Sequence, residues 1–161
     1  MKIIPLEASD PLWWPTAEYA ENCSWGAGKH LAQRMREERF APGERVFIVL
    51  DHERICGYCT FTEKDCLPDV DYSPYIGFVF VDEAYRGRRL SGALCQAVCA
   101  YAVEAGFSQI YLVSDHQGLY EKYGFTPLLQ KLAPWGELET IFSFDLSKVA
   151  SIQDLVLEET E

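Results

Sequence analysis

The chain has 161 residues, 48% hydrophobic and 24% charged, which is the composition of a globular protein large enough to bury one core. Its formal net charge of −11 argues against a nucleic-acid-binding surface, because such a surface needs a basic stripe. The first apolar run ends at Pro5 and Glu7, and no stretch approaches the roughly 20 apolar residues of a membrane span. We therefore expect a cytoplasmic protein with no nucleic-acid and no membrane partner.

The first 63 residues predict one strand, two helices and a hairpin. Apolar residues recur at helical spacing between residues 12 and 40, and Gly26 and Gly28 interrupt the pattern, so we expect two helices rather than one. Runs rich in β-branched and aromatic residues predict strands over residues 2–6, 45–51 and 54–63, of which the last two form a hairpin.

The second half of the chain predicts a parallel βαβ unit. After an irregular acidic connection, an apolar run predicts a strand over residues 75–81. A helical pattern then runs from Leu90 to Gly106, whose glycine is a typical C-terminal cap, and a further strand follows over residues 109–113. Residues 75–113 thus have the length of a crossover between two parallel strands.

The C-terminal part predicts a short helix over residues 119–123 and a late strand over residues 139–146. The sequence shows no repeat, long linker or low-complexity tract. We assign residues 1–146 to one domain and residues 147–161 to an acidic tail, which is either mobile or a last helix.

Six cysteines raise the question of a metal site or disulfides. Cys56 and Cys59 form a Cys-x-x-Cys pair, but no second pair follows at zinc-site spacing, and residues three apart on a strand point to opposite faces. Cys95 and Cys99 are four apart on the predicted helix and fit its buried side. We expect reduced thiols and no metal.

Three arginines gather where a predicted strand gives way to a helix. Arg86, Arg88 and Arg89 lie within four residues of an otherwise acidic chain. A helix N-terminus presents unpaired N–H groups, and Gly87 allows a ligand to approach the backbone closely, so the pattern is typical of a phosphate site. The P-loop and dinucleotide fingerprints are missing from the sequence. The alternative is a solvated surface in which the arginines pair with Asp82 and Glu83.

The stretch "PYIGFVFVDEAYRGRRLSGAL", followed by "GLYEKYGF", resembles the GNAT superfamily of N-acetyltransferases, which use acetyl-coenzyme A. Arg86 and Gly87 match the start of that family's pyrophosphate motif, Arg/Gln-x-x-Gly-x-Gly/Ala. The second stretch matches the family's Tyr-x-Lys-x-Gly-Phe pattern at four positions, namely Tyr120, Lys122, Gly124 and Phe125. Arg89 and Ser91 stand where the family usually has small residues.

The resemblance implies a mixed α/β (α+β) fold with a mostly antiparallel sheet of six or seven strands and about four helices. It also implies that the donor's pantetheine arm binds the backbone of the fourth strand, and that its phosphates bind the following loop. The residues that it assigns to acetyl-coenzyme A are Phe78, Val79, Phe80, Val81, Arg86, Gly87, Arg88, Arg89, Leu90, Ser91 and Gly92. Arg89 either reaches the phosphates or reshapes the loop.

By the same resemblance, Tyr120 is the general acid that protonates the departing thiolate, since a phenol is protonated at pH 7. The fourth strand carries no carboxylate over its first residues, so the general base is open. His116, just before Tyr120, has a pKa range suited to the role, and Asp69, Asp71 or an ordered water are its rivals. No cysteine has a basic neighbour that suggests a covalent intermediate.

The acceptor pocket implied by the resemblance lies near Trp25, Asp71 and Tyr72, where aromatic and acidic side chains suit a cationic amine. We expect an N-acetyltransferase that acts on a primary amine of a small molecule. Two alternatives remain, an enzyme that acetylates proteins or peptides and a non-catalytic sensor or assembly module that binds acetyl-coenzyme A. A homodimer is left open.

Overall fold

A computed structural model describes residues 1–67 and 69–149 of the chain. Seven strands form one sheet, which is antiparallel except where the fourth and fifth strands pair. Their spatial order is β1-β2-β3-β4-β5-β7-β6. The strands are β1 (Lys2–Leu6), β2 (Arg45–Asp51), β3 (Arg54–Thr62), β4 (Tyr75–Val81), β5 (Gln109–Ser114), β6 (Thr126–Leu132) and β7 (Leu138–Asp145).

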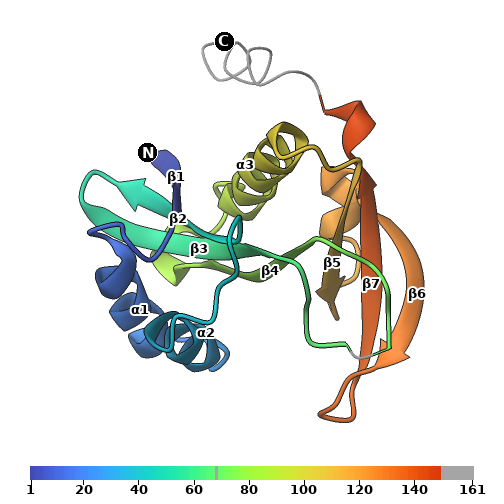
Figure 1. The fold of residues 1–161 in the computed structure, drawn as a ribbon, viewed down its shortest axis with the longest axis horizontal. Coiled ribbons are helices and arrows are strands. Elements are labelled where there is room, and N and C mark those ends of the chain that lie inside the picture. The colour runs from blue at the N-terminus through green and yellow to red at the C-terminus, as the bar shows by residue number, and fades with distance from the viewer. Residues whose placement is uncertain (68, 150–161) are drawn as a thin grey trace.

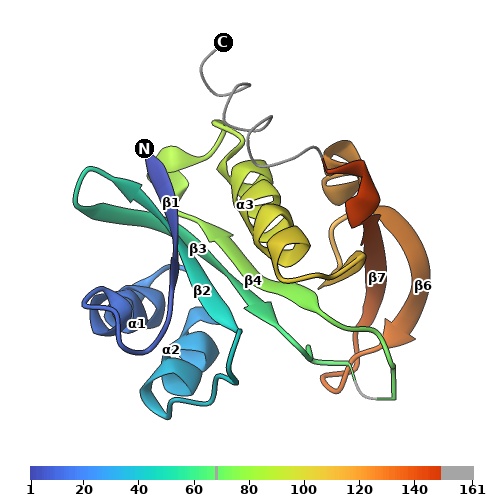
Figure 2. The same cartoon turned by 45° about the horizontal axis from the view of Figure 1, so that its top comes forward.

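Among the described residues, three α-helices cover the two faces of the sheet. Helices α1 (Trp13–Asn22) and α2 (Gly28–Arg36) lie on one face, and α3 (Leu90–Glu104) lies on the other (Figures 1 and 2). Gly106, at φ +93°, follows the end of α3, as the sequence predicts. Of the described helices, none has both the length and the apolar character that crossing a membrane requires.

The strand pattern explains why both faces are covered. Val46, Ile48 and Leu50 of β2 pack under α1 and α2, whereas the alternate residues Phe47 and Val49 pack under α3. Side chains alternate between the faces of a strand, so a strand that is apolar at every position has to be buried on both sides. The N-terminal half of the sheet is therefore the middle layer of three.

The predicted fold class is confirmed, with two differences in detail. The fourth helix expected near Tyr120 is a single 3-10 turn (Tyr120–Tyr123), closed by Gly124 at φ +94°. Strand β6 was not predicted, because it is an edge strand with most side chains exposed and with Pro127 near its start. The predicted C-terminal tail lies mostly outside the described residues, apart from a 3-10 turn at Leu146–Lys148.

The cysteines are all unpaired thiols, and four of them are buried against α3 and the sheet. Burial raises the pKa of Cys99 to about 12 and raises that of Cys59 as well. These thiols are therefore neutral at physiological pH, which makes them poor nucleophiles. They act as small core residues.

Candidate active site

The central feature of the site is a gap between β4 and β5. Within the described chain the two strands share only two residue pairs, Tyr75 with Tyr111 and Ile76 with Leu112, and beyond them the strands separate (Figure 1). The edge of β4 from Gly77 onward therefore presents backbone N–H and C=O groups toward the gap. Such an edge can pair with an extended ligand as it would with another strand.

A β-bulge lies at the point where the strands separate. Tyr58 pairs with Phe80 and Thr60 pairs with Gly77, so Phe78 and Val79 of β4 together face one residue of β3. Phe78 has φ +49°, a left-handed conformation that costs a bulky residue roughly 1–3 kcal/mol. Bulges of this kind bend a strand and redirect its backbone groups. All four β4 residues that the sequence assigns to acetyl-coenzyme A lie at or beyond this bulge.

The loop after β4 has the geometry of an anion site. Gly87 has φ +83° and Arg89 has φ +58°, and α3 begins directly afterwards with Leu90. Left-handed residues alternating with other conformations turn successive N–H groups toward one point, and the helix N-terminus adds its own free N–H groups. Loop and helix together therefore form a concave set of donors suited to phosphate.

The three arginines of this loop are exposed, and in the described part of the chain none of them forms an ion pair. The Arg86 side chain donates from Nε to the carbonyl oxygen of Val81 at 3.2 Å, and Arg88 lies over the ring of Tyr85 at 5.1 Å. Asp82 instead accepts hydrogen bonds from Tyr19 and from the N–H of Ala84. This arrangement disfavours the alternative of arginines neutralised by neighbouring carboxylates.

The small residues at the start of α3 bring the helix close to the turn that carries Tyr120. The Ser91 and Tyr123 hydroxyls are hydrogen-bonded at 2.7 Å. A Cβ on Gly92 would lie only 2.8 Å from Cε1 of Tyr123. Gly92 therefore allows the start of α3 to pack directly against the turn that carries Tyr120.

Replacing Arg89 by glycine should raise the stability of the fold and weaken the binding of acetyl-coenzyme A. The left-handed conformation costs a non-glycine residue about 1–2 kcal/mol, part of which is offset by the greater freedom of glycine in the unfolded chain. We expect Arg89→Gly to raise the free energy of unfolding by up to about 1 kcal/mol while weakening the binding of acetyl-coenzyme A. Urea unfolding and calorimetry measure the two effects.

The matched control is Arg88→Gly, which removes a neighbouring guanidinium at a position without a positive φ. It should weaken binding without any gain in stability. Equal losses of stability in both variants would show that the Arg89 backbone is not strained.

Tyr120 is buried, with 5% of its surface exposed, between the rings of Phe125 and Phe142. Burial raises the pKa of its phenol, and the neighbouring thiols of Cys95 and Cys59 raise it further. Cys59 lies on β3 between Tyr58 and Thr60, whose partners on β4 flank the bulge. Because Tyr120 lies near Cys59, it is close to the point where β4 and β5 separate. The hydroxyl thus stays protonated at neutral pH, as a general acid must.

The other predicted residues contact different elements near the site or are exposed. His116 is exposed, and its ring centroid lies 6.5 Å from that of Tyr120. Trp25 stacks on Phe80 of β4, with centroids 6.2 Å apart and planes 6° from parallel. Tyr72 packs on Tyr111 at 4.7 Å, whereas Asp71 is exposed. The role of each in binding or catalysis stays a prediction.

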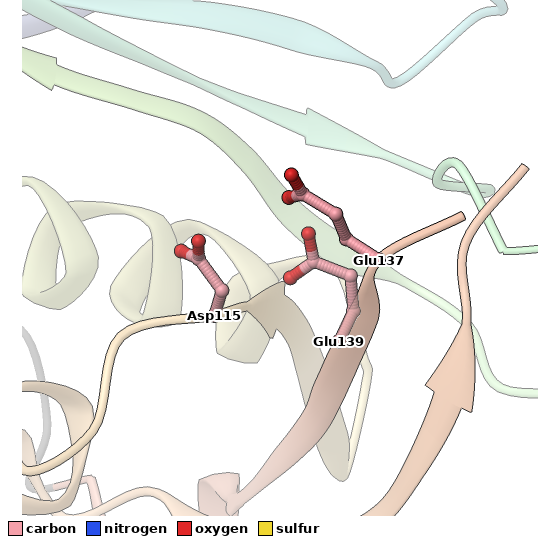
Figure 3. Close-up of side chains that lie close together, drawn as sticks. All are labelled: Asp115, Glu137 and Glu139. Carbon is pink, nitrogen blue, oxygen red and sulfur yellow. The ribbon is translucent and has the colours of Figure 1, made fainter. Parts of the chain in front are cut away.

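An acidic cluster that the sequence does not predict lies at the end of β5. The carboxylates of Asp115, Glu137 and Glu139 point toward one another, with oxygens within 4.8 Å (Figure 3). Burial raises the pKa of the Glu139 carboxyl, and the charges of Asp115 and Glu137 raise it further. Segments distant in sequence build this cluster, and "WGELE" alone reads as an ordinary turn. A cation bound here would relieve the repulsion.

A separate hollow of about 610 Å³ lies between α1 and the β2–β3 hairpin. It is lined by Glu18, Tyr19 and Glu53, and it reaches Phe80 and Asp82 at the end of β4. The described residues that line the hollow include none of the acidic cluster.

The mixed sheet, the gap beside a bulged strand and the loop leading into a central helix define an acyltransferase of the coenzyme A-dependent class. Residues 6–125 match the acetyltransferase (GNAT) family, and the chain belongs to that family. No curated protein matches the sequence.

Several solved structures share the fold at low sequence identity. The aminoglycoside 6′-N-acetyltransferase from Enterococcus faecium is 14% identical, with 94% of this chain and 100% of that chain covered and a TM-score of 0.71. A GNAT family N-acetyltransferase from Escherichia coli, in complex with coenzyme A, is 20% identical, with 90% and 81% covered and a TM-score of 0.65. A chimera of the spermidine N-acetyltransferase from Vibrio cholerae is 14% identical, with 92% and 98% covered and a TM-score of 0.64.

Family membership confirms the resemblance read from the two motifs. It also confirms acetyl-coenzyme A as the donor and an acetyltransferase as the class of enzyme. The residues present fit this donor, because β4 offers a free backbone edge and the loop before α3 offers unpaired N–H groups and guanidiniums.

Proposed function

We propose that the protein transfers the acetyl group of acetyl-coenzyme A to a primary amine of a small cationic molecule, by direct attack of the amine on the thioester. The observation that carries the proposal is the gap beside the β4 bulge, which combines a free strand edge with a buried, protonated Tyr120. An extended pantetheine arm can bind the free edge of β4, and the Tyr120 phenol can donate a proton at the end of that arm.

The donor would be held at two places. Arg88, Arg89 and the N–H groups at the start of α3 would bind the phosphates with charge-assisted hydrogen bonds. The backbone of residues 78–81 would bind the pantetheine arm in strand-like fashion, as the family resemblance implies.

Tyr120 would act as the general acid. Acyl transfer breaks the C–S bond, and the departing thiolate takes the phenolic proton, which solvent later restores. Because burial raises the pKa of Tyr120, the phenol is protonated over the whole physiological range. The buried thiols of Cys59 and Cys95 leave no activated cysteine to compete as a nucleophile.

The acidic cluster supports a cationic acceptor. Asp115, Glu137 and Glu139 concentrate negative charge near the end of β5, where the gap opens. Structural neighbours include enzymes named for aminoglycosides and for spermidine, both of which carry several amines. A second ammonium of the acceptor would neutralise this charge while the first is acetylated. Trp25 and Tyr72 would supply aromatic walls.

Three sequence-based expectations stay predictions, namely the single domain over residues 1–146, the separate tail from residue 147 and the cytoplasmic location. The homodimer stays open. Sedimentation of the purified chain would measure the oligomeric state directly.

Calorimetric titration of acetyl-coenzyme A at about 50 mM and about 300 mM salt tests donor binding, because phosphate contacts weaken as salt screens them. We expect binding that is weaker at high salt, and about tenfold weaker again in Arg88→Ala. The control is Arg36→Ala, which removes an exposed arginine paired with Glu21 far from the loop. Release of free thiol with spermidine or kanamycin as acceptor then tests turnover.

The outcomes separate the candidate functions. Absence of binding at both salt concentrations would contradict the proposal and the sensor alternative together. Tight binding with no thiol release from any amine would favour the sensor or assembly module. Thiol release only with peptide acceptors would favour a protein acetyltransferase.

A further inference from the structure

A carboxylate stands against β4 although β4 carries none of its own. A Cβ placed on Gly77 would lie 3.0 Å from Oδ2 of Asp65, in the connection between β3 and β4. The same point lies 3.0 Å from Oγ1 of Thr60 on β3. Glycine at this position therefore leaves room for two oxygens from other parts of the chain, which meet at one spot of the strand.

Two buried hydroxyls border this spot, and neither has a hydrogen-bond partner among the described residues. Thr60 is 1% exposed and Tyr75 is 2% exposed, and Oγ1 of the first and Oη of the second are unpaired. Burial, with the Asp65 charge as the next contribution, raises the pKa of Tyr75 to about 12, so its hydroxyl remains a donor. A buried unpaired hydroxyl costs about 1–3 kcal/mol, which a bound polar group would recover.

The position lies where the gap between β4 and β5 begins. Gly77 directly follows Ile76, the last residue of β4 that pairs with β5, and directly precedes Phe78 of the bulge. Tyr75 and Gly77 lie on the face opposite Ile76, whose side chain packs under α3. The Asp65 carboxylate thus lies beside β4 on the face that α3 leaves free.

We propose that Asp65 binds the acceptor ammonium and acts as its general base, with Thr60 as a second hydrogen-bonding partner. The assignment rests on the proposed acetyltransferase function. The Asp65 carboxylate takes one proton from the ammonium, and the freed lone pair forms the C–N bond to the thioester carbon. The C–S bond then breaks with proton donation from Tyr120, and the amide nitrogen loses its extra proton to solvent.

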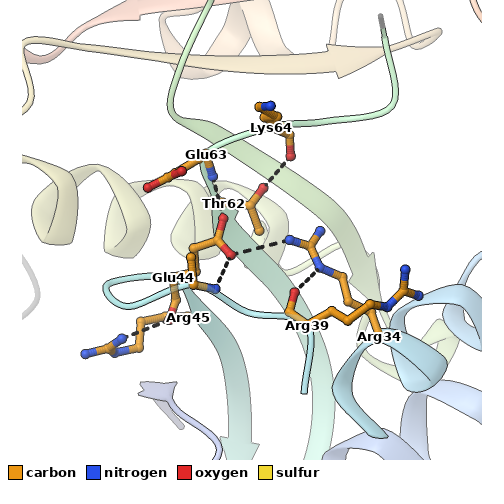
Figure 4. A network of polar contacts seen from close by, with 8 residues as sticks. Arg34, Arg39, Glu44, Arg45, Thr62, Glu63 and Lys64 are labelled. Atoms are coloured by element: carbon orange, nitrogen blue, oxygen red, sulfur yellow. Dashed lines mark hydrogen bonds and ion pairs between the residues drawn. The ribbon is translucent and has the colours of Figure 1, made fainter. Parts of the chain in front are cut away.

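The connection that carries Asp65 is held by a buried carboxylate. Oε2 of Glu44 accepts a hydrogen bond from the N–H of Glu63 at 2.7 Å, and its Oε1 pairs with Arg34 at 3.4 Å (Figure 4). The Thr62 hydroxyl donates to the carbonyl of Lys64 at 2.9 Å. Glu44 and Thr62 therefore fix the backbone just before Asp65 and act as positioning residues.

Asp65→Asn tests the assignment. The amide oxygen can still accept the Cys66 N–H that Oδ1 accepts now, so the fold should be retained. We expect kcat/KM for spermidine or kanamycin to fall by about 100-fold or more, with unchanged binding of acetyl-coenzyme A. Asp65→Glu, which keeps the carboxylate, should recover part of the loss. The matched control is Glu63→Gln, an exposed carboxylate two residues away, which should keep wild-type activity.

The pH profile distinguishes a base from a merely structural residue. The wild-type kcat/KM should rise with pH through one ionisation that Asp65→Asn removes. The titratable groups that face Asp65 are Tyr75 on β4, Glu139 on β7 and Cys66 beside it, so Glu139→Gln is measured in parallel.

Three results would overturn the assignment. Wild-type kinetics in Asp65→Asn would exclude it, as would loss of the ionisation in His116→Ala but not in Asp65→Asn. Failure of the wild-type enzyme to acetylate either amine, with acetyl-coenzyme A bound, would contradict the proposed function and the Asp65 assignment with it. Acetylation by both the wild-type enzyme and Asp65→Asn would contradict the Asp65 assignment alone, so the failures of the two proposals can be distinguished.

Discussion

Tyr120→Phe should lower kcat by about 100-fold or more and leave the affinity for acetyl-coenzyme A unchanged. The substitution removes one oxygen and keeps the ring, which packs between Phe125 and Phe142, so the core is preserved. Without the phenolic proton, the thiolate departs as an anion in a buried site, where charge is costly. Single-turnover thiol release, with calorimetry of donor binding, measures the two quantities.

The control is Tyr101→Phe, which removes a tyrosine hydroxyl that donates to the Gly43 carbonyl away from the gap. It should keep wild-type kcat. Since burial raises the pKa of Tyr120, ionisation of this phenol should cause no loss of wild-type kcat below pH of about 10. A Tyr120→Phe enzyme with wild-type kcat would show that water or another group protonates the thiolate.

Gly28→Ala should lower the free energy of unfolding by about 3 kcal/mol. A Cβ on Gly28, the first residue of α2, would overlap the carbonyl oxygen of Ala20 in α1, and would lie 2.7 Å from Sγ of Cys23 and 2.9 Å from Oη of Tyr58. Because the Ala20 oxygen belongs to the backbone, the helices have to separate. The gain in helix propensity from alanine, up to about 1 kcal/mol, does not offset this.

Gly26→Ala is the matched control, since a Cβ there meets no atom within 4 Å. It should change stability little, and urea unfolding compares the two variants. A movement of α2 would also disturb Trp25, which packs on Phe78 and Phe80 of the donor strand. Equal stabilities of the two alanine variants would contradict the close contact between α1 and α2.

The sequence predicts the parts of the site that are local. The Arg86–Ser91 loop and the Tyr120–Tyr123 turn are continuous segments. Their residue types depend on local features, namely the start of a helix, a positive φ and the burial of residues a few positions apart. Strands β2 and β4 are equally readable, because a short run of buried apolar residues is a local property.

The acceptor side could not be predicted in the same way. Asp65 becomes a candidate only because Gly77, twelve residues later and on another strand, has no side chain to exclude it. Asp115 meets Glu139 through the β5–β7 pairing, which no local pattern reveals. The rivals named from sequence, Asp69 and Asp71, are exposed in the same connection that places Asp65 against the sheet. Proximity across strands decides these roles.

The two residue pairs between β4 and β5 have a mechanical consequence. Within the one sheet, β1–β4 and β5–β7 are therefore joined by this short pairing and by the core cluster that contains residues of α3 and of strands on both sides. A donor arm bound along β4 would lengthen that pairing with its own hydrogen bonds. The bound donor would thus extend the sheet across the gap, and product release would remove this added pairing.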